Sequence, residues 1–162
     1  TLIALNDGQQ PIFGVIDQPY TAERFVGGLG MAFLERHGVK TPLATRKKRH
    51  LSEATIFTTF PEVGSPLEAE AFHAVAGQCQ LTRYGMDCYA YALLAAGQID
   101  LVIEAGLQAY DIQAPMALVQ AAGGVVSDWR GGNPMNGGRC ICAATPELHA
   151  AALEILREVP LG

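Results

Sequence analysis

The sequence predicts an α/β protein in which an antiparallel β-meander precedes a mixed layer of strands and helices. Short apolar runs divided by turn residues fill the first part of the chain, whereas strand and helix patterns alternate after the basic run Arg46–His50. We therefore expect two domains, residues 1–50 and residues 51–162. The 162 residues are 49% hydrophobic and 17% charged, which is enough apolar material for a core.

Each strand of the meander is predicted from an apolar run and the turn residues beside it. The segment Asn6–Gln10 contains Asn, Asp and Gly, which form hairpin turns, and it separates two apolar runs. A second turn is expected at Gln18–Tyr20, which contains a proline. The expected strands are Leu2–Leu5, Pro11–Asp17, Glu23–Gly27, Met31–Leu34 and Leu43–Thr45.

The helices of the second domain are predicted from their caps. Ser65 can cap the first helix, Pro66 suits its first position, and Glu68 completes a capping box. Gly97 and Gly123 are placed to end the next two helices. The apolar stripe expected on the first helix is Leu67, Ala71 and Val75.

The remaining elements of the second domain alternate along the chain, as in a mixed sheet flanked by helices. In one strand, Leu101 and Ile103 share a face, while Val102 and Glu104 share the other. The expected strands are Ala54–Thr58, Ile99–Glu104, Val125–Trp129 and Ile141–Ala144. The expected helices are Cys88–Ala96, Asp111–Ala122 and a last helix that begins at Thr145 and Pro146.

Charge and cysteine spacing exclude several classes of function. The net charge of −5 and the sequence pI near 5.3 argue against nucleic acid or an anionic membrane as the partner. The basic run Arg46–His50 is interpreted as a solvated loop, since it lacks interleaved aromatics. The four cysteines lack metal-ligand spacing, which is typical of free thiols in a reducing compartment. We expect a cytoplasmic protein, because there is no signal peptide or long apolar span.

Two acidic residues stand where carboxylates can do chemistry. Asp111 is at the start of a helix, where an aspartate either caps free N–H groups or binds a hard divalent cation. One aspartate cannot hold Mg²⁺ tightly, so the metal interpretation requires further carboxylates. Glu104 ends a strand and is either an edge charge in water or an acceptor for a polar or cationic substrate group.

The segment around Gly85 is a third candidate. Gly85 can relax the backbone of a strand-to-helix turn, with Asp87 as its N-cap. Alternatively, the segment is a recognition loop in which Arg83 offers several donors and Asp87 binds a cation or a donor.

Taken together, these residues resemble the C-terminal region of the inositol monophosphatase family. Gly85 matches the family's turn glycine, and Glu104 matches the glutamate that contacts the substrate alcohol. Asp111 matches the aspartate of a Trp-Asp-x-Ala-Ala motif, a ligand of catalytic Mg²⁺ in the family. Gly124 ends a match to Glu-Ala-Gly-Gly, and Tyr110 replaces the usual tryptophan. The resemblance covers the whole chain, including the opening hairpin.

Two further segments resemble the histidinol-phosphate phosphatase branch of this family, namely Arg83–Tyr91 and Gly14–Pro19. Histidinol carries an ammonium and an imidazole, so Asp87 beside Glu104 would form a suitably acidic pocket. Inositol is neutral and has less need of such a pocket. The resemblance therefore implies Arg83, Gly85, Asp87 and Glu104 as substrate-binding residues and Asp111 as a metal ligand.

The resemblance also implies a layered α/β/α/β/α fold, with residues 1–50 as the end of the metal-site domain. The family's Asp-Pro-Ile-Asp-Gly-Thr motif is absent, so we expect no catalytic residue within this chain, but expect those residues upstream. The chain also begins with Thr1 inside an apolar run. We therefore expect a fragment that is inactive alone.

The expected activity of the complete protein is Mg²⁺-dependent hydrolysis of a small-molecule phosphate monoester. Histidinol phosphate, an intermediate of histidine biosynthesis, is the expected substrate, and a homodimer is expected from the family. One alternative is an inositol-1-monophosphatase or another sugar monophosphatase. An alternative of another class is a non-catalytic binding or interaction module.

Overall fold

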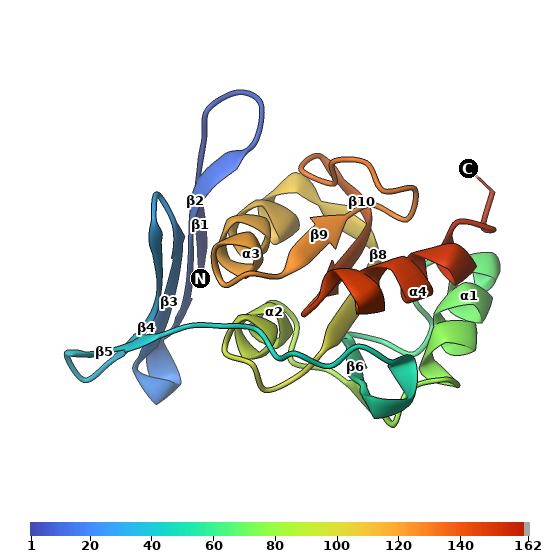
Figure 1. Ribbon diagram of the computed structural model, residues 1–162. Coiled ribbons are helices and arrows are strands. Elements are labelled where there is room, and N and C mark those ends of the chain that lie inside the picture. Colours follow the sequence, from blue (N-terminus) through green and yellow to red (C-terminus); the bar gives the residue numbers. More distant parts are fainter. Residues whose placement is uncertain (161–162) are drawn as a thin grey trace.

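The computed structural model of the chain describes residues 1–160 and consists of stacked layers (Figure 1). An antiparallel sheet forms one side, and a mixed sheet lies deeper in the molecule. One pair of helices fills the space between the two sheets, and a second pair covers the far face of the mixed sheet. The predicted α/β class, with a meander before a mixed sheet, is confirmed.

The first sheet is a meander in which each strand pairs with the next one along the chain. The first four predicted strands are confirmed, but the prediction at Leu43–Thr45 is wrong. A turn through His37 and Gly38 lets Val39–Pro42 pair with the preceding strand, and the chain then leaves the sheet. The strands are β1 (Leu2–Asn6), β2 (Pro11–Gln18), β3 (Glu23–Gly28), β4 (Met31–Arg36) and β5 (Val39–Pro42).

The second sheet combines parallel and antiparallel pairs in the order β7-β6-β8-β10-β9. Strand β6 is parallel to both of its neighbours, β7 and β8, whereas β10 is antiparallel to β8 and β9. The sequence did not predict β7, because its four residues lie at an edge and show no apolar alternation. The strands are β6 (Thr55–Thr58), β7 (Leu81–Tyr84), β8 (Leu101–Gln108), β9 (Val125–Ser127) and β10 (Gly137–Ala143).

Two of the four helices begin at the caps that the sequence predicted, Ser65 and Thr145. The prediction of Asp87 as the N-cap of the second helix is wrong, because Cys88 takes that position and makes no side-chain cap bond. The third helix begins after Gln108 and not at Asp111.

In the first helix, Ser65 and Glu68 form the reciprocal capping box, and the Ser65 N–H donates to Glu68 Oε2 at 2.6 Å. Its predicted stripe is partly wrong, because Leu67 is 54% exposed and Phe72 is buried instead. The helices are α1 (Pro66–Ala76), α2 (Tyr89–Ala95), α3 (Ala109–Ala121) and α4 (Pro146–Leu156). Short 3₁₀ turns cover Pro19–Thr21 and Leu51–Glu53.

The two faces of the mixed sheet carry separate apolar clusters. Leu101 and Ile103 of β8 point into the cluster beneath α1 and α4, and Val102 points into the cluster beneath α2 and α3. This alternation was predicted. It places the side chain of Glu104, the next residue on the Val102 face, at the layer between the two sheets.

Helix α3 packs directly on the backbone of the meander. A Cβ added at Gly14 would lie 2.3 Å from the Ala114 carbonyl oxygen, and one at Gly27 would lie 2.4 Å from Leu118 Cα. Only glycine fits at such distances, so these two positions allow α3 to seat on β2 and β3. Among residues 1–160, no helix has the length and apolar character needed to cross a membrane.

Candidate active site

Glu104 is held at the carboxyl ends of the parallel strands. Its side chain is only 7% exposed, and both carboxylate oxygens accept hydrogen bonds from the end of β6. The Thr58 hydroxyl donates to Oε2 at 3.0 Å, while the Thr59 N–H and hydroxyl donate to Oε1 at 2.7 and 2.8 Å. The position is that of ligand sites in α/β sheets, as the sequence suggested.

Burial dominates the electrostatics of Glu104. Loss of water raises the pKa of this carboxyl, the threonine hydrogen bonds act in the opposite direction, and the negative charge of Asp87 raises the pKa further. A carboxyl group with a raised pKa favours a cationic neighbour, because a positive charge would stabilise its ionised form.

The loop that carries Asp87 has an unusual backbone. Gly85, Met86 and Asp87 all have positive φ angles, of 86°, 73° and 46°. Left-handed conformations are strained for residues with a Cβ, so two consecutive non-glycine residues there require support from the surroundings. The Gly85 N–H, which donates to the carbonyl oxygens of Thr58 and Thr59, ties the loop to the strand end that binds Glu104.

The negative charge of Asp87 acts on two neighbouring groups, Glu104 and Cys88. Its charge raises the pKa of Glu104. Burial raises the pKa of the nearby Cys88 thiol, and the charges of Asp87 and Asp111 raise it further. Asp87 and Asp111 therefore both act on the thiol of Cys88, just before α2, and Asp87 also acts on Glu104.

Asp111 does not occupy the predicted N-cap. The helix begins two residues earlier, with Gln108 as the N-cap, and the Asp111 carboxylate accepts the Gln108 N–H at 2.8 Å as the third helical residue. The predicted helix start is wrong because Ala109 and Tyr110 already belong to the helix. One carboxylate oxygen is used by this cap, and the other has no hydrogen bond within residues 1–160.

The described residues do not make a complete metal centre. Nowhere in residues 1–160 do three or more His, Cys, Asp or Glu side chains group closely enough to hold a metal ion. Divalent Mg²⁺ requires several oxygen ligands in octahedral geometry. Asp111 can offer one oxygen, so a cation here needs donors beyond these residues.

Arg83 is not brought to the carboxylates by any hydrogen bond. It is exposed on edge strand β7, and its guanidinium donates to the neighbouring Thr82 carbonyl oxygen at 3.0 Å. Its role in substrate binding stays a prediction, as do those of Gly85, Asp87 and Glu104 and the metal-ligand role of Asp111.

The sequence did not reveal the residues that support the site. Thr58 ends a predicted strand and Thr59 follows it, and their hydrogen bonds to Glu104 depend on the order of strands in the sheet. Tyr91 is a second case, since its hydroxyl is buried and has no hydrogen-bond partner among the described residues. Burial raises its pKa, and the charges of Glu104 and Asp87 act in the same direction.

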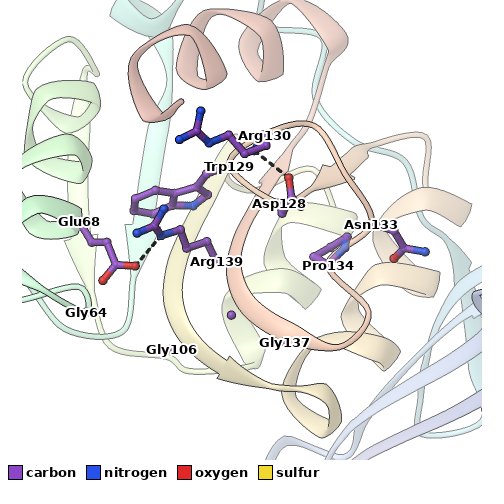
Figure 2. A pocket seen from close by; sticks show the side chains of 11 residues that line it. Gly64, Glu68, Gly106, Asp128, Trp129, Arg130, Asn133, Pro134, Gly137 and Arg139 are labelled. Carbon is purple, nitrogen blue, oxygen red and sulfur yellow. Dashed lines mark hydrogen bonds and ion pairs between the residues drawn. The ribbon is translucent and has the colours of Figure 1, made fainter. Parts of the chain in front are cut away.

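A cavity of about 450 Å³ lies elsewhere, beside α1 and the loop between β9 and β10 (Figure 2). Arg139 stacks over the Trp129 ring and pairs with Glu68 at 2.6 Å. The Arg139 guanidinium also donates to the Pro160 carbonyl oxygen, and that of Arg130 donates to the Val159 carbonyl oxygen. The two arginines are therefore occupied by Glu68 and by carbonyl oxygens near the end of the described chain. None of the predicted site residues lines this cavity.

Comparison with known proteins places these features in context. The model of the inositol monophosphatase family matches residues 1–161. A bifunctional phosphatase of Arabidopsis thaliana, IMPL2, chloroplastic, is 42% identical over 136 residues, which are 81% of this chain and 37% of that protein. An inositol-1-monophosphatase of Caulobacter vibrioides is 29% identical over 93% of this chain and 60% of its own length.

A solved structure shows the same fold. An inositol monophosphatase from Zymomonas mobilis superposes with a TM-score of 0.88 and 34% sequence identity, over 96% of this chain and 61% of that one. The chain thus spans roughly three fifths of these two monophosphatases and a smaller share of IMPL2. This is more than the C-terminal part alone that the sequence suggested.

Proposed function

Because this chain belongs to the inositol monophosphatase family, we propose that it forms the substrate-recognition side of a phosphate monoester hydrolase. The observation that carries the proposal is the buried Glu104 carboxylate, which Thr58 and Thr59 hold at the strand ends to which the loop of Asp87 is tied. Glu104 and Asp87 would face the alcohol part of the substrate, and Asp111 would face the phosphate.

We propose that the alcohol carries a positive charge, as histidinol phosphate does. The support is electrostatic: burial and the negative charge of Asp87 both raise the pKa of Glu104, and an ammonium group beside Glu104 would stabilise its ionised form. Within residues 1–160, neither carboxylate forms an ion pair with an arginine, and the Arg83 guanidinium donates instead to the Thr82 carbonyl oxygen. A place in histidine biosynthesis follows from this proposal. A neutral sugar phosphate is the second candidate, favoured by the names of the Caulobacter and Zymomonas relatives.

We propose Mg²⁺ as the cofactor, with Asp111 as one ligand and the others from parts of the relatives that this chain does not match. When bound, the cation would neutralise the phosphate and polarise a water molecule. The residues of this chain would bind and orient the alcohol, with Glu104 fixed by the two threonines. On this view the 162-residue chain is inactive alone. A homodimer in the cytoplasm is part of the same proposal.

A chimera tests the function directly. The matched region of the Zymomonas enzyme is replaced by this chain, and phosphate release is measured with Mg²⁺ from histidinol phosphate and from inositol 1-phosphate. We expect hydrolysis that Asp111→Asn abolishes and a preference for histidinol phosphate that Asp87→Ala removes. A preference for inositol phosphate would support the second candidate. A folded chimera that hydrolyses neither substrate would contradict the phosphatase assignment and favour a non-catalytic module.

A further inference from the structure

The side chain of Tyr89 joins the loop that carries Asp87 to the meander sheet. Tyr89 is the first residue of α2, two positions after Asp87. Its hydroxyl donates to Glu23 Oε2 at 2.6 Å, across 66 residues of sequence. Its ring meets that of Phe25 edge-on, with centroids 5.8 Å apart. Glu23 and Phe25 both belong to β3, so the start of α2 is held against one strand of the other sheet.

Glu23 is itself fixed by neighbours on three sides. The Thr21 hydroxyl donates to the same Oε2 atom at 2.8 Å, and Arg36 lies 3.7 Å from Oε1. The Tyr89 hydrogen bond is the main cause that lowers the pKa of Glu23, and Thr21 and Arg36 act in the same direction. Glu23 is therefore an ionised acceptor with a defined orientation, and hydrogen bonds to such groups are shorter and stronger than neutral ones.

The anchor is continuous with the strained loop. The Tyr89 N–H donates to the Met86 carbonyl oxygen at 2.9 Å, and the Ala90 N–H donates to that of Asp87 at 3.1 Å. These bonds close the left-handed segment onto the first turn of α2. At its other end the segment is tied to Thr58 and Thr59 through Gly85. The strained conformation persists because both ends are fixed.

We propose that Tyr89 and Glu23 are positioning residues for Asp87, so that the meander sheet sets the preference of the neighbouring site for an amine-bearing alcohol. This inference rests on the proposed function and deepens it. Neither residue needs to touch the substrate. Without the Tyr89–Glu23 bond, the loop relaxes from its left-handed conformation, and Asp87 no longer faces the ligand beside Glu104.

The test measures binding of L-histidinol and of myo-inositol to the 162-residue chain by titration calorimetry. For Tyr89→Phe we expect the affinity for L-histidinol to fall about tenfold, as for the loss of one charge-assisted hydrogen bond, with unchanged weak binding of inositol. The matched control is Tyr20→Phe, which removes the same atom from a side chain that is 97% exposed. Its affinity for L-histidinol should equal that of the wild type.

Changes at Glu23 distinguish positioning from general stability. Glu23→Gln keeps an oxygen that accepts from Tyr89 and should bind within about threefold of the wild type, whereas Glu23→Leu should match Tyr89→Phe. The double variant of Tyr89→Phe and Glu23→Leu should lose no more than either single change, since both remove one interaction. The amide resonances of residues 85–87 should shift in Tyr89→Phe and stay in place in Tyr20→Phe.

The possible outcomes distinguish failure of this inference from failure of the proposed function. If the wild type binds L-histidinol no better than inositol, the proposed amine recognition fails and this inference with it. If the wild type prefers L-histidinol and Tyr89→Phe retains that preference while folded, the inference alone is overturned. Loss of preference in Tyr89→Phe, with rescue in Glu23→Gln, supports both.

Discussion

The two sheets of this molecule differ in how completely they are covered. The mixed sheet lies between two helix pairs, and both of its faces belong to buried clusters. The meander receives α2 and α3 on its inner face, and none of the described helices lies against its outer face (Figure 1). The outer face carries a row of neighbouring apolar side chains, from Ile3 at the exposed edge through Val15 and Val26 to Phe33.

The two sheets also position the groups of the candidate site in different ways. The mixed sheet positions Glu104 through its own strand order, which brings the ends of β6 and β8 together. The meander contributes no predicted site residue, yet it contacts the site through Tyr89 and through the seat of α3 on Gly14 and Gly27. A sheet covered on one face therefore acts on the site through a few discrete contacts.

The largest effect is expected in the buried sheet. Phe72→Ala removes a ring that is fully buried beneath the mixed sheet, and we expect it to lower the free energy of unfolding by about 4 kcal/mol. Ile3→Ala, on the outer face of the meander, removes a side chain that is 58% exposed. This change should alter the free energy of unfolding by less than about 0.5 kcal/mol. Urea unfolding of both variants measures the difference. Equal losses would mean that the outer face is covered in solution.

A smaller effect is expected where the two regions meet. Gly27→Ala places a Cβ 2.4 Å from Leu118 Cα, so α3 must move away from β3, and we expect a loss of about 2 kcal/mol in unfolding free energy. Gly77→Ala is the matched control, because Gly77 has a helical φ and looser surroundings. Its unfolding free energy should stay within about 1 kcal/mol of the wild type. A tolerated Gly27→Ala would show that α3 does not seat on the meander as described.

Loss of the N-cap of α1, in the mixed-sheet region, should lower the unfolding free energy by a still smaller amount. Ser65→Ala removes the hydroxyl that accepts the Glu68 N–H, and we expect a loss of about 1 kcal/mol in thermal or urea unfolding. Ser52→Ala, at an exposed serine, is the control and should leave the unfolding transition in place. A null result for Ser65→Ala would argue that tertiary packing alone defines where this helix begins.

The smallest effects concern two carboxylates, one in each region, whose pKa values shift in opposite directions. Glu104 has a raised pKa, so the folded state holds its proton longer than the unfolded state. The stability of the wild type relative to Glu104→Gln should fall as pH rises above the ordinary glutamate pKa. Glu23 has a lowered pKa, so its contribution is complete above that value and is lost as pH falls below it. Urea titrations from about pH 3 to pH 8 measure how each glutamate's contribution to the unfolding free energy depends on pH. If both contributions changed with pH in the same direction, the opposite pKa shifts assigned to Glu104 and Glu23 would be contradicted.

Local chemistry made much of this fold predictable. The hairpin between β1 and β2 follows from turn residues, of which Asp7 accepts two backbone N–H groups, and the capping box of Ser65 and Glu68 needs only four consecutive residues. The elements that were missed depend on neighbours instead. Strand β7 pairs with β6 alone, and the exposure of Leu67 and burial of Phe72 depend on which side of α1 faces the sheet.

The sequence proposed members for the candidate site, and their roles stay predictions, but it did not predict the geometry around them. It selected Asp87, Glu104 and Asp111, and it could not show that Thr58 and Thr59 bind Glu104. It placed Asp111 at the wrong helix position, because Gln108 is an unusual N-cap. Contacts such as that between Tyr89 and Glu23 join residues that no local rule connects. They depend on the packing of one sheet against a helix from the other region.

The seat of α3 on the meander has a consequence for how the chain is made. The meander strands end at residue 42, but the helix that covers their inner face ends at residue 121. At translation rates of 5–20 residues per second, the finished meander waits roughly 4–16 s for its cover to leave the ribosome. During that interval both of its apolar faces are open to water, and its glycine seats are empty. Nascent chains of this protein should therefore bind a holdase chaperone until the third helix has emerged.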